Sequence, residues 1–303
     1  MVKLKNDEAN IYSYGLIRNQ ENRNNLLVVA QEKGTDTFPA IVNDVEVTVL
    51  KVQNEFVYCK GFYPHGICEY NNNLCILSNE GSARWRFLEI EYKINVLNKE
   101  EELYQSFCQI KLLGVSTTYL PQLFRSVETM FYPYPNCYFS LLKWEGEQNY
   151  NAIKIKKTIS TSPFLSRDTL IIDYTPHRLS HVLRLFKIDH EGFRKQCATF
   201  IKKKQRHIVV DNEKGYVFGV SFNISKIQDC LFCQVEIEYW SKIIPILSHE
   251  TLIHYDDTSQ RIDSHSKLVE GVCQYLAMNG IKYDKVQLQK NIWLQRIATS
   301  TMR

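Results

Sequence analysis

The sequence predicts a β-dominated α+β protein whose centre is an antiparallel barrel with flanking helices. Tyr and Phe are abundant, at 18 and 15 of 303 residues, which is typical of strands rather than of helices. Charged and apolar side chains alternate strictly over residues 87–94, and the same alternation returns over 234–239. Because successive side chains leave a strand on opposite faces, each segment is predicted to be a strand with one charged face. Helical spacing of apolar residues is limited to a few segments between and after these strands.

The composition is that of an intracellular globular protein. Hydrophobic residues at 44% and charged residues at 23% exclude a disordered chain, and no run of about 18 apolar residues predicts a membrane span. Nine cysteines at irregular spacing argue for a reducing compartment, the nucleus or the cytoplasm. The close pair Cys230 and Cys233 lacks partners at zinc-binding spacing, so these thiols are expected to be buried apolar groups. The formal charge of +4 permits an anionic partner without requiring one.

The chain is predicted to divide into a β-rich N-terminal extension, residues 1–80, and a barrel with C-terminal helices, residues 81–303. The stretch 62–66 is expected to be a loop because it contains Pro64 and Gly66, and 115–150 is expected to be irregular because of its prolines. Helices are predicted over 99–113, 177–200, 267–278 and 284–297. Strands are predicted over 152–159, 170–174, 202–210 and 232–240, with a hairpin over 208–224.

Several of these strands carry charged side chains on one face. The acidic positions are Glu89, Glu91, Glu236 and Glu238, and the basic ones are Lys93, Lys154, Lys156, Lys202, Lys204 and Arg206. Such a face cannot pack on an apolar core, so it faces either solvent or the inside of a barrel around a charged ligand. A closed barrel of about eight strands has room for side chains or one small ligand. Carboxylates on one wall suit Mg²⁺ or Mn²⁺, and cations on the others suit a metal-bound polyphosphate.

These motifs resemble those of a known family. Glu89-Ile90-Glu91-Tyr92-Lys93 resembles the Glu-x-Glu-x-Lys strand of the triphosphate tunnel metalloenzymes, and Glu236-Ile237-Glu238 is similar to their closing Glu-x-Glu strand. Lys202-x-Lys204-x-Arg206 is similar to the alternating basic strand of the fungal, protozoal and viral RNA 5′-triphosphatases within that group. The resemblance covers residues 85–300. It departs from the family at Ser221 and Asn223, where an acidic residue is expected, and at Trp240, where RNA triphosphatases often have a third Glu.

The resemblance implies an eight-stranded tunnel that hydrolyses a triphosphate with Mg²⁺ or Mn²⁺. The four glutamates would hold the metal, Lys93 would assist catalysis, and the remaining basic residues would bind phosphate oxygens. The first step of mRNA capping is the activity implied, with triphosphate-ended RNA as substrate and a protein of the capping apparatus as a further partner. Two alternatives remain open: a hydrolase of thiamine triphosphate or inorganic triphosphate, and a non-catalytic relative that binds nucleic acid or protein through the basic segment and a Tyr-rich loop.

Overall fold

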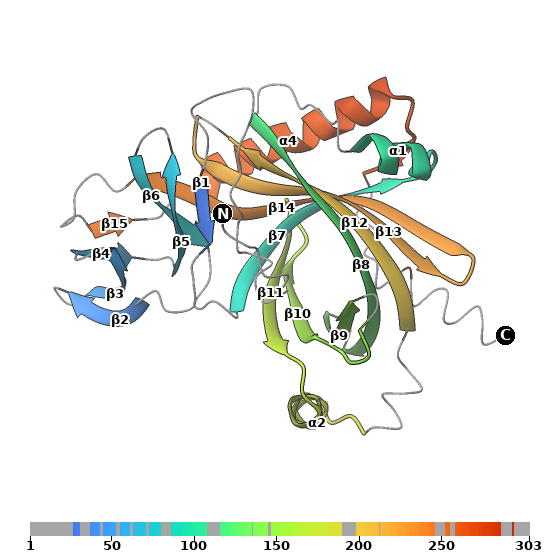
Figure 1. Ribbon diagram of the computed structural model, residues 1–303, viewed down its shortest axis with the longest axis horizontal. Coiled ribbons are helices and arrows are strands. Elements are labelled where there is room, and N and C mark those ends of the chain that lie inside the picture. The colour runs from blue at the N-terminus through green and yellow to red at the C-terminus, as the bar shows by residue number, and fades with distance from the viewer. Residues whose placement is uncertain are drawn as a thin grey trace.

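The structure is a computed structural model of the chain, shown as a ribbon in Figure 1. It describes residues 27–30, 37–42, 45–52, 55–60, 63–70, 73–79, 86–107, 116–134, 136–144, 147–189, 198–211, 213–245, 252–254, 258–285 and 293.

Eight strands close into an antiparallel barrel. They are β7 (Arg86–Val96), β8 (Ser116–Tyr134), β9 (Cys137–Trp144), β10 (Ala152–Ser160), β11 (Leu165–Asp173), β12 (Ala198–Val210), β13 (Tyr216–Ile227) and β14 (Cys230–Pro245). Their order is β14-β13-β12-β8-β9-β10-β11-β7, and the additional pairing of β14 with β7 completes the ring. Every pairing in this ring is antiparallel. The predicted fold class, a β-dominated protein with an eight-stranded antiparallel barrel, is confirmed.

The N-terminal strands join the barrel sheet and also build a second sheet. Strands β1 (Leu27–Ala30), β5 (Tyr63–Tyr70) and β6 (Asn73–Asn79) continue the barrel sheet beyond β14. The second sheet contains β2 (Thr37–Val42), β3 (Val45–Val52), β4 (Glu55–Lys60) and β15 (Leu252–His254), and lies to one side of the barrel in Figure 1. β16 (Tyr283–Asp284) pairs with β7. Strands from both sides of residue 80 therefore share both sheets, and the division into two domains stays a prediction.

Parts of the outward faces of the barrel strands are apolar and are covered by helices. Helix α4 (Thr258–Met278) packs Val272 and Leu276 into the same cluster as Val235 and Ile237 of β14. Helix α2 (Pro176–Leu185) covers another part of the wall, where Phe139, Leu141 and Ile153 meet Leu179, Val182 and Leu183. Figure 1 shows these two helices on opposite sides of the barrel. Because these apolar residues of β9, β10 and β14 point outward, the residues that alternate with them point into the barrel.

A tight turn sets the register of β12 and β13. The Asp211 side chain accepts hydrogen bonds from the backbone N–H groups of Glu213 and Lys214, at 3.0 and 3.1 Å. Gly215 has a φ of +73° and donates to the Asp211 carbonyl at 2.7 Å. Only glycine adopts this conformation without strain, and a Cβ there would lie 2.9 Å from the Ile243 carbonyl oxygen. The hairpin predicted over 208–224 is thus present, and Asp211 and Gly215 form its turn.

Two segments predicted to be irregular are strands. The predicted loop at 62–66 is wrong, because Tyr63–Gly66 belongs to β5 and the register shifts between Pro64 and Gly66. The prediction for 115–150 is also wrong over most of its length, which forms β8 and β9. In β8 the register shifts opposite Lys204 and Arg206, next to Pro121, and again between Phe131 and Tyr134, around Pro133. A proline lacks the N–H of a regular ladder, and bulges accommodate it without ending the strand.

The predicted helices differ from the observed ones in their ends. Helix α1 (Glu100–Ser106) lies inside the predicted 99–113, of which residues 108–113 lie outside the described residues. The helix predicted over 177–200 ends at Leu185, because Lys187 takes a left-handed φ of +55° and Ile188 N–H bonds back to the Leu183 carbonyl at 2.9 Å. Asp284, predicted to start the last helix, is in β16, and residues 286–292 lie outside the described residues.

Candidate active site

The two acidic strands are neighbours, and their charged faces point into the barrel. The register of β7 and β14 places Glu91 opposite Glu238 and Lys93 opposite Glu236. Side chains opposite one another in an antiparallel pair have Cβ atoms roughly 5 Å apart. Their alternate neighbours Ile90, Ile94 and Ile237 lie in the outer apolar cluster, which fixes the carboxylates on the inner face. The four glutamates are all buried.

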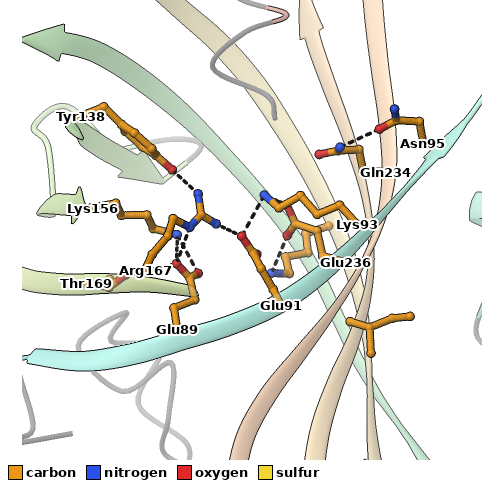
Figure 2. Close-up of polar contacts among 12 residues, drawn as sticks. Glu89, Glu91, Lys93, Asn95, Tyr138, Lys156, Arg167, Thr169, Gln234 and Glu236 are labelled. Atoms are coloured by element: carbon orange, nitrogen blue, oxygen red, sulfur yellow. Dashed lines mark hydrogen bonds and ion pairs between the residues drawn. The ribbon is translucent and has the colours of Figure 1, made fainter. Parts of the chain in front are cut away.

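Arg167 connects the two carboxylates of β7. Its guanidinium Nε lies 3.3 Å from Glu89 Oε2, and its Nη2 contacts Glu91 Oε1 (Figure 2). Arg167 Nη1 donates a hydrogen bond to the Tyr138 hydroxyl at 2.8 Å. Thr169, on the same face of β11, donates to Glu89 Oε2 at 3.1 Å. With an exposed fraction of 2%, Arg167 is one of the most buried charges of the barrel.

Three lysines extend this contact into a continuous chain of ion pairs. Lys156 Nζ lies 2.7 Å from Glu89, at one end of the chain in Figure 2. Lys93 Nζ lies 3.1 Å from Glu91 Oε1 and 3.3 Å from Glu236 Oε1, so it joins β7 to β14. Lys204 Nζ lies 3.8 Å from Glu236 Oε2 at the other end. Acidic and basic groups therefore alternate across the interior, from β10 to β12.

The pKa values of three of these groups are shifted by burial and by their partners. Burial alone would raise the pKa of Glu89, but Arg167 and Lys156 outweigh it and hold this pKa well below its ordinary value. Burial lowers the pKa of Lys156, and the carboxylates of Glu89, Glu238 and Glu236 more than reverse this effect and raise it. Burial, Arg206 and Lys202 together lower the pKa of Lys204 well below its ordinary value.

The described interior carries more positive than negative charge. Four cations, Lys93, Lys156, Arg167 and Lys204, form ion pairs with three of the four glutamates, and the fourth, Glu238, acts on Lys156 electrostatically. Three more cations lie on inward positions, Lys154 beside Lys156 on β10, and Lys202 and Arg206 on either side of Lys204 on β12. None of these three contacts a carboxylate of the described residues. Counted in their ordinary charged forms, the side chains leave an excess of three cations in an enclosed space.

The interior carboxylates fit a hard divalent cation in their chemistry. Carboxylate oxygens are the ligands that Mg²⁺ and Mn²⁺ prefer. Among the described residues, however, no three His, Cys, Asp or Glu side chains are gathered as a metal-binding group. The ion pairs explain this, because Arg167 and Lys93 lie between the acids and hold them apart. A metal would have to replace these cations at Glu89, Glu91, Glu236 and Glu238.

The structure places every residue selected from the sequence on the inner face of the barrel. Seven of them belong to the ion-pair chain or act on it electrostatically: Glu89, Glu91, Lys93, Lys156, Lys204, Glu236 and Glu238. Lys154, Lys202 and Arg206 lie on the same faces of β10 and β12. The acid expected on β13 is absent, and Ser221 and Asn223 occupy its inward positions opposite Arg206 and Lys204. Both polar atoms of Asn223, which is fully buried, lack a hydrogen-bond partner among the described residues.

Sequence reasoning missed Arg167, Thr169 and Tyr138. The predicted strand 170–174 begins earlier, at Leu165, and this extension contains Arg167 and Thr169. Residues 166–169 are all polar, so no alternation of apolar and polar side chains marked this part of the strand in the sequence. Tyr138 lay in a segment predicted to be irregular and had no such signal.

Comparisons with known proteins give resemblance at the level of solved structures alone. No protein-family model matches the sequence, and no curated protein matches it. HpAC1 from Hippeastrum, described as a putative adenylyl cyclase with a dominant triphosphatase activity, is 11% identical with a TM-score of 0.43, and the match covers 69% of this chain and 95% of that one. A putative adenylate cyclase from Bacillus halodurans is 11% identical with a TM-score of 0.36, covering 68% and 96%. Similarities of this size assign no activity to this chain.

No helix among the described residues is long and apolar enough to cross a membrane.

Proposed function

We propose that this protein is a metal-dependent triphosphatase that acts on the 5′-triphosphate end of RNA. The observation that supports the proposal is the charge arrangement inside the barrel: four buried glutamates, four cations that form ion pairs with three of them, and three further cations. Buried charges are costly unless they are paired or serve a ligand, so an enclosed cationic excess calls for an anion. A triphosphate with its divalent cation supplies both the anion and a counterpart for the glutamates.

The cations on the inner face would bind and orient the phosphate chain. Lys154, Lys202 and Arg206 are available to phosphate oxygens, since they have no carboxylate partner among the described residues. Lys93, Lys156 and Arg167 now neutralise the glutamates and would turn to the phosphate once a metal takes their place. Positive side chains fixed in an enclosed site stabilise the charge that develops on the transferred phosphoryl group.

A bound Mg²⁺ or Mn²⁺ would supply Lewis acidity at a phosphate oxygen and orientation of the attacking water. Glu89, Glu91, Glu236 and Glu238 are the residues that would hold it. In the reaction, water attacks the terminal phosphorus, the bond from that phosphorus to the bridging oxygen breaks, and orthophosphate and a diphosphate end leave with release of a proton. Lys93 and Arg167, which lie between the carboxylates, would offset the charge on the leaving diphosphate.

Release of phosphate from triphosphate-ended RNA tests the proposal. We expect activity with Mn²⁺ or Mg²⁺ that is lost in Glu89→Ala and in Glu236→Ala. Lys156→Ala should lose most of the activity, whereas Lys157→Ala should retain it, because the neighbouring Lys157 is exposed on the outside of the same strand. Inorganic triphosphate and thiamine triphosphate, tested beside the RNA, distinguish a small-molecule hydrolase from an RNA triphosphatase. Activity that both glutamate variants retain would refute the site.

A second function, binding without catalysis, is favoured by one observation. Ser221 and Asn223 stand where an acid is expected, so the interior lacks that carboxylate. The basic segment of β12 lies inside the barrel, and Tyr132 and Tyr134 lie in the strand β8 rather than in a loop. Binding of RNA that falls steeply with salt, with no phosphate release under any metal, would favour this function.

A further inference from the structure

Arg206 has a surrounding that differs from those of the paired cations of the barrel. Its Nε donates a hydrogen bond to the Ser221 hydroxyl at 3.4 Å, and its guanidinium carbon lies 4.7 Å from the centre of the Trp240 ring. Ser221 is its register partner on β13, and Trp240 belongs to β14, the strand on the other side of β13. The guanidinium is therefore held at one edge and over one aromatic ring, while its terminal amino groups contact none of the described residues.

Trp240 can take this place only because of Gly219. The indole is 2% exposed and fills the inner face of the barrel beside β13. A Cβ at Gly219 would lie 2.3 Å from two carbons of the indole ring, which is far inside van der Waals contact. The indole of Trp240 thus occupies the space that a side chain at position 219 would need.

We infer that Trp240 and Gly219 are positioning residues that hold Arg206 ready to bind a phosphate group with both terminal amino groups. The planar guanidinium matches two oxygens of one phosphate, but only when its plane and edge are fixed. Trp240 fixes the plane and Ser221 the edge, so the fork is oriented before the ligand arrives and little rotamer freedom is lost on binding. Lys154 and Lys202 share the absence of a carboxylate partner, but no aromatic ring among the described residues lies against them. This inference rests on the proposed function, because the phosphate is that of the triphosphate.

The test is calorimetric binding of inorganic triphosphate without divalent metal, to a set of variants whose folding is checked by thermal melting. Trp240→Leu removes the aromatic ring and should weaken binding by about 5- to 30-fold, the equivalent of one cation–π contact. Trp240→Phe keeps a ring and should recover most of the affinity. Gly219→Ala should act like Trp240→Leu, because it displaces the indole. Gly271→Ala is the matched control, since a Cβ there meets nothing within 4 Å.

The decisive comparison is made in an Arg206→Lys background. If Trp240 acts through the guanidinium, then Trp240→Leu should change triphosphate affinity by less than about twofold once Arg206 is a lysine. A Trp240 that only supports the fold would weaken binding by the same factor in both backgrounds, and this result would overturn the inference. Hydrolysis with unaltered triphosphate affinity in Arg206→Lys and Trp240→Leu would overturn the inference and leave the proposed function standing. A wild-type protein that neither binds nor hydrolyses triphosphate would overturn both.

Discussion

Replacing Arg167 by methionine should destabilise the protein by about 3 kcal/mol. The guanidinium is 2% exposed and lies against two buried carboxylates, Glu89 and Glu91. Breaking a buried ion pair from one side costs about 3–5 kcal/mol, because a charge remains without its partner. Here Glu89 keeps Lys156 at 2.7 Å and Glu91 keeps Lys93 at 3.1 Å, which places the expected loss at the lower end of this range.

Urea unfolding at pH 7 measures the loss, and a second substitution tests its cause. Glu91→Gln removes the charge that Arg167→Met leaves behind, so the double variant should be more stable than the sum of the two single effects by about 1–2 kcal/mol. Arg178→Met is the control, because its pair with Asp173 is at 3.3 Å on the surface and should contribute about 0–1 kcal/mol. Strict additivity of the first two substitutions would refute the electrostatic explanation, and so would an unfolding free energy that Arg167→Met leaves unchanged.

Three further predictions concern pH, backbone conformation and ligand linkage. Burial lowers the pKa of His265 from 6.5 to about 3, so its contribution to stability is complete above pH 6.5 and is lost as the pH falls toward 3. This group should lower the unfolding free energy by about 2 kcal/mol between pH 7 and pH 5. Urea unfolding measured across this pH range should show a weaker pH dependence of the unfolding free energy in His265→Gln. An unaltered pH dependence would exclude His265 as its source. Gly215→Ala should destabilise the protein by about 1–2 kcal/mol, because position 215 has a positive φ. Gly271→Ala should stabilise it by about 0.5–1 kcal/mol, because position 271 lies inside α4 and has room for a Cβ. Thermal melting measures both changes, and equal shifts in melting temperature would contradict the reasoning. Mn²⁺ should bind weakly alone and about tenfold more tightly when a non-hydrolysable triphosphate analogue is present. The reason is that the anion draws Lys93 and Arg167 away from the glutamates. Calorimetry measures both Mn²⁺ affinities, and equal values would show that no such exchange occurs.

The environment of the two ring nitrogens of His265 explains why its pKa is lowered. Its Nε2 donates to the Ile237 carbonyl at 2.9 Å, and its Nδ1 has no hydrogen-bond partner among the described residues. Its ring stacks on Phe164 at 4.1 Å, and Arg261 is close enough to oppose a positive charge. A proton on Nδ1 would therefore be buried without a hydrogen-bond partner in the folded protein. In the unfolded chain the same proton is hydrated by water, so protonation favours unfolding.

The barrel was predictable because its strands repeat one pattern. Glu89, Glu91, Glu236 and Glu238 alternate with large aliphatic residues, and a charged face enclosed by strands has few alternatives to a lumen. The pairing of β7 with β14 joins residues about 145 positions apart in the sequence, and local patterns carry no information on such a pairing. Similarity between the two motifs, rather than periodicity, suggested that they meet.

The missed parts have a common physical origin in irregular strand pairing. Pro133 suggested a break, yet β8 passes both Pro121 and Pro133 at shifts in register, where a residue without an N–H group is tolerated. Arg167 was missed because its strand was started at the apolar run 170–172. The alternation of acids with Arg167 and Lys93, instead of a cluster of acids, depends on side-chain contacts between strands that no single segment encodes.

The barrel wall carries its apolar packing residues on the outer face and its charged residues on the inner face. Apolar residues on its outer face pack against α2 and α4, so this part of the hydrophobic stabilisation comes from outside the lumen. Substitutions of lumen residues alter the charge balance of the interior but leave this outer packing in place. The residues that line such a barrel can consequently change to bind a different anion while the fold is kept. A relative that has lost its catalytic residues can keep the same fold.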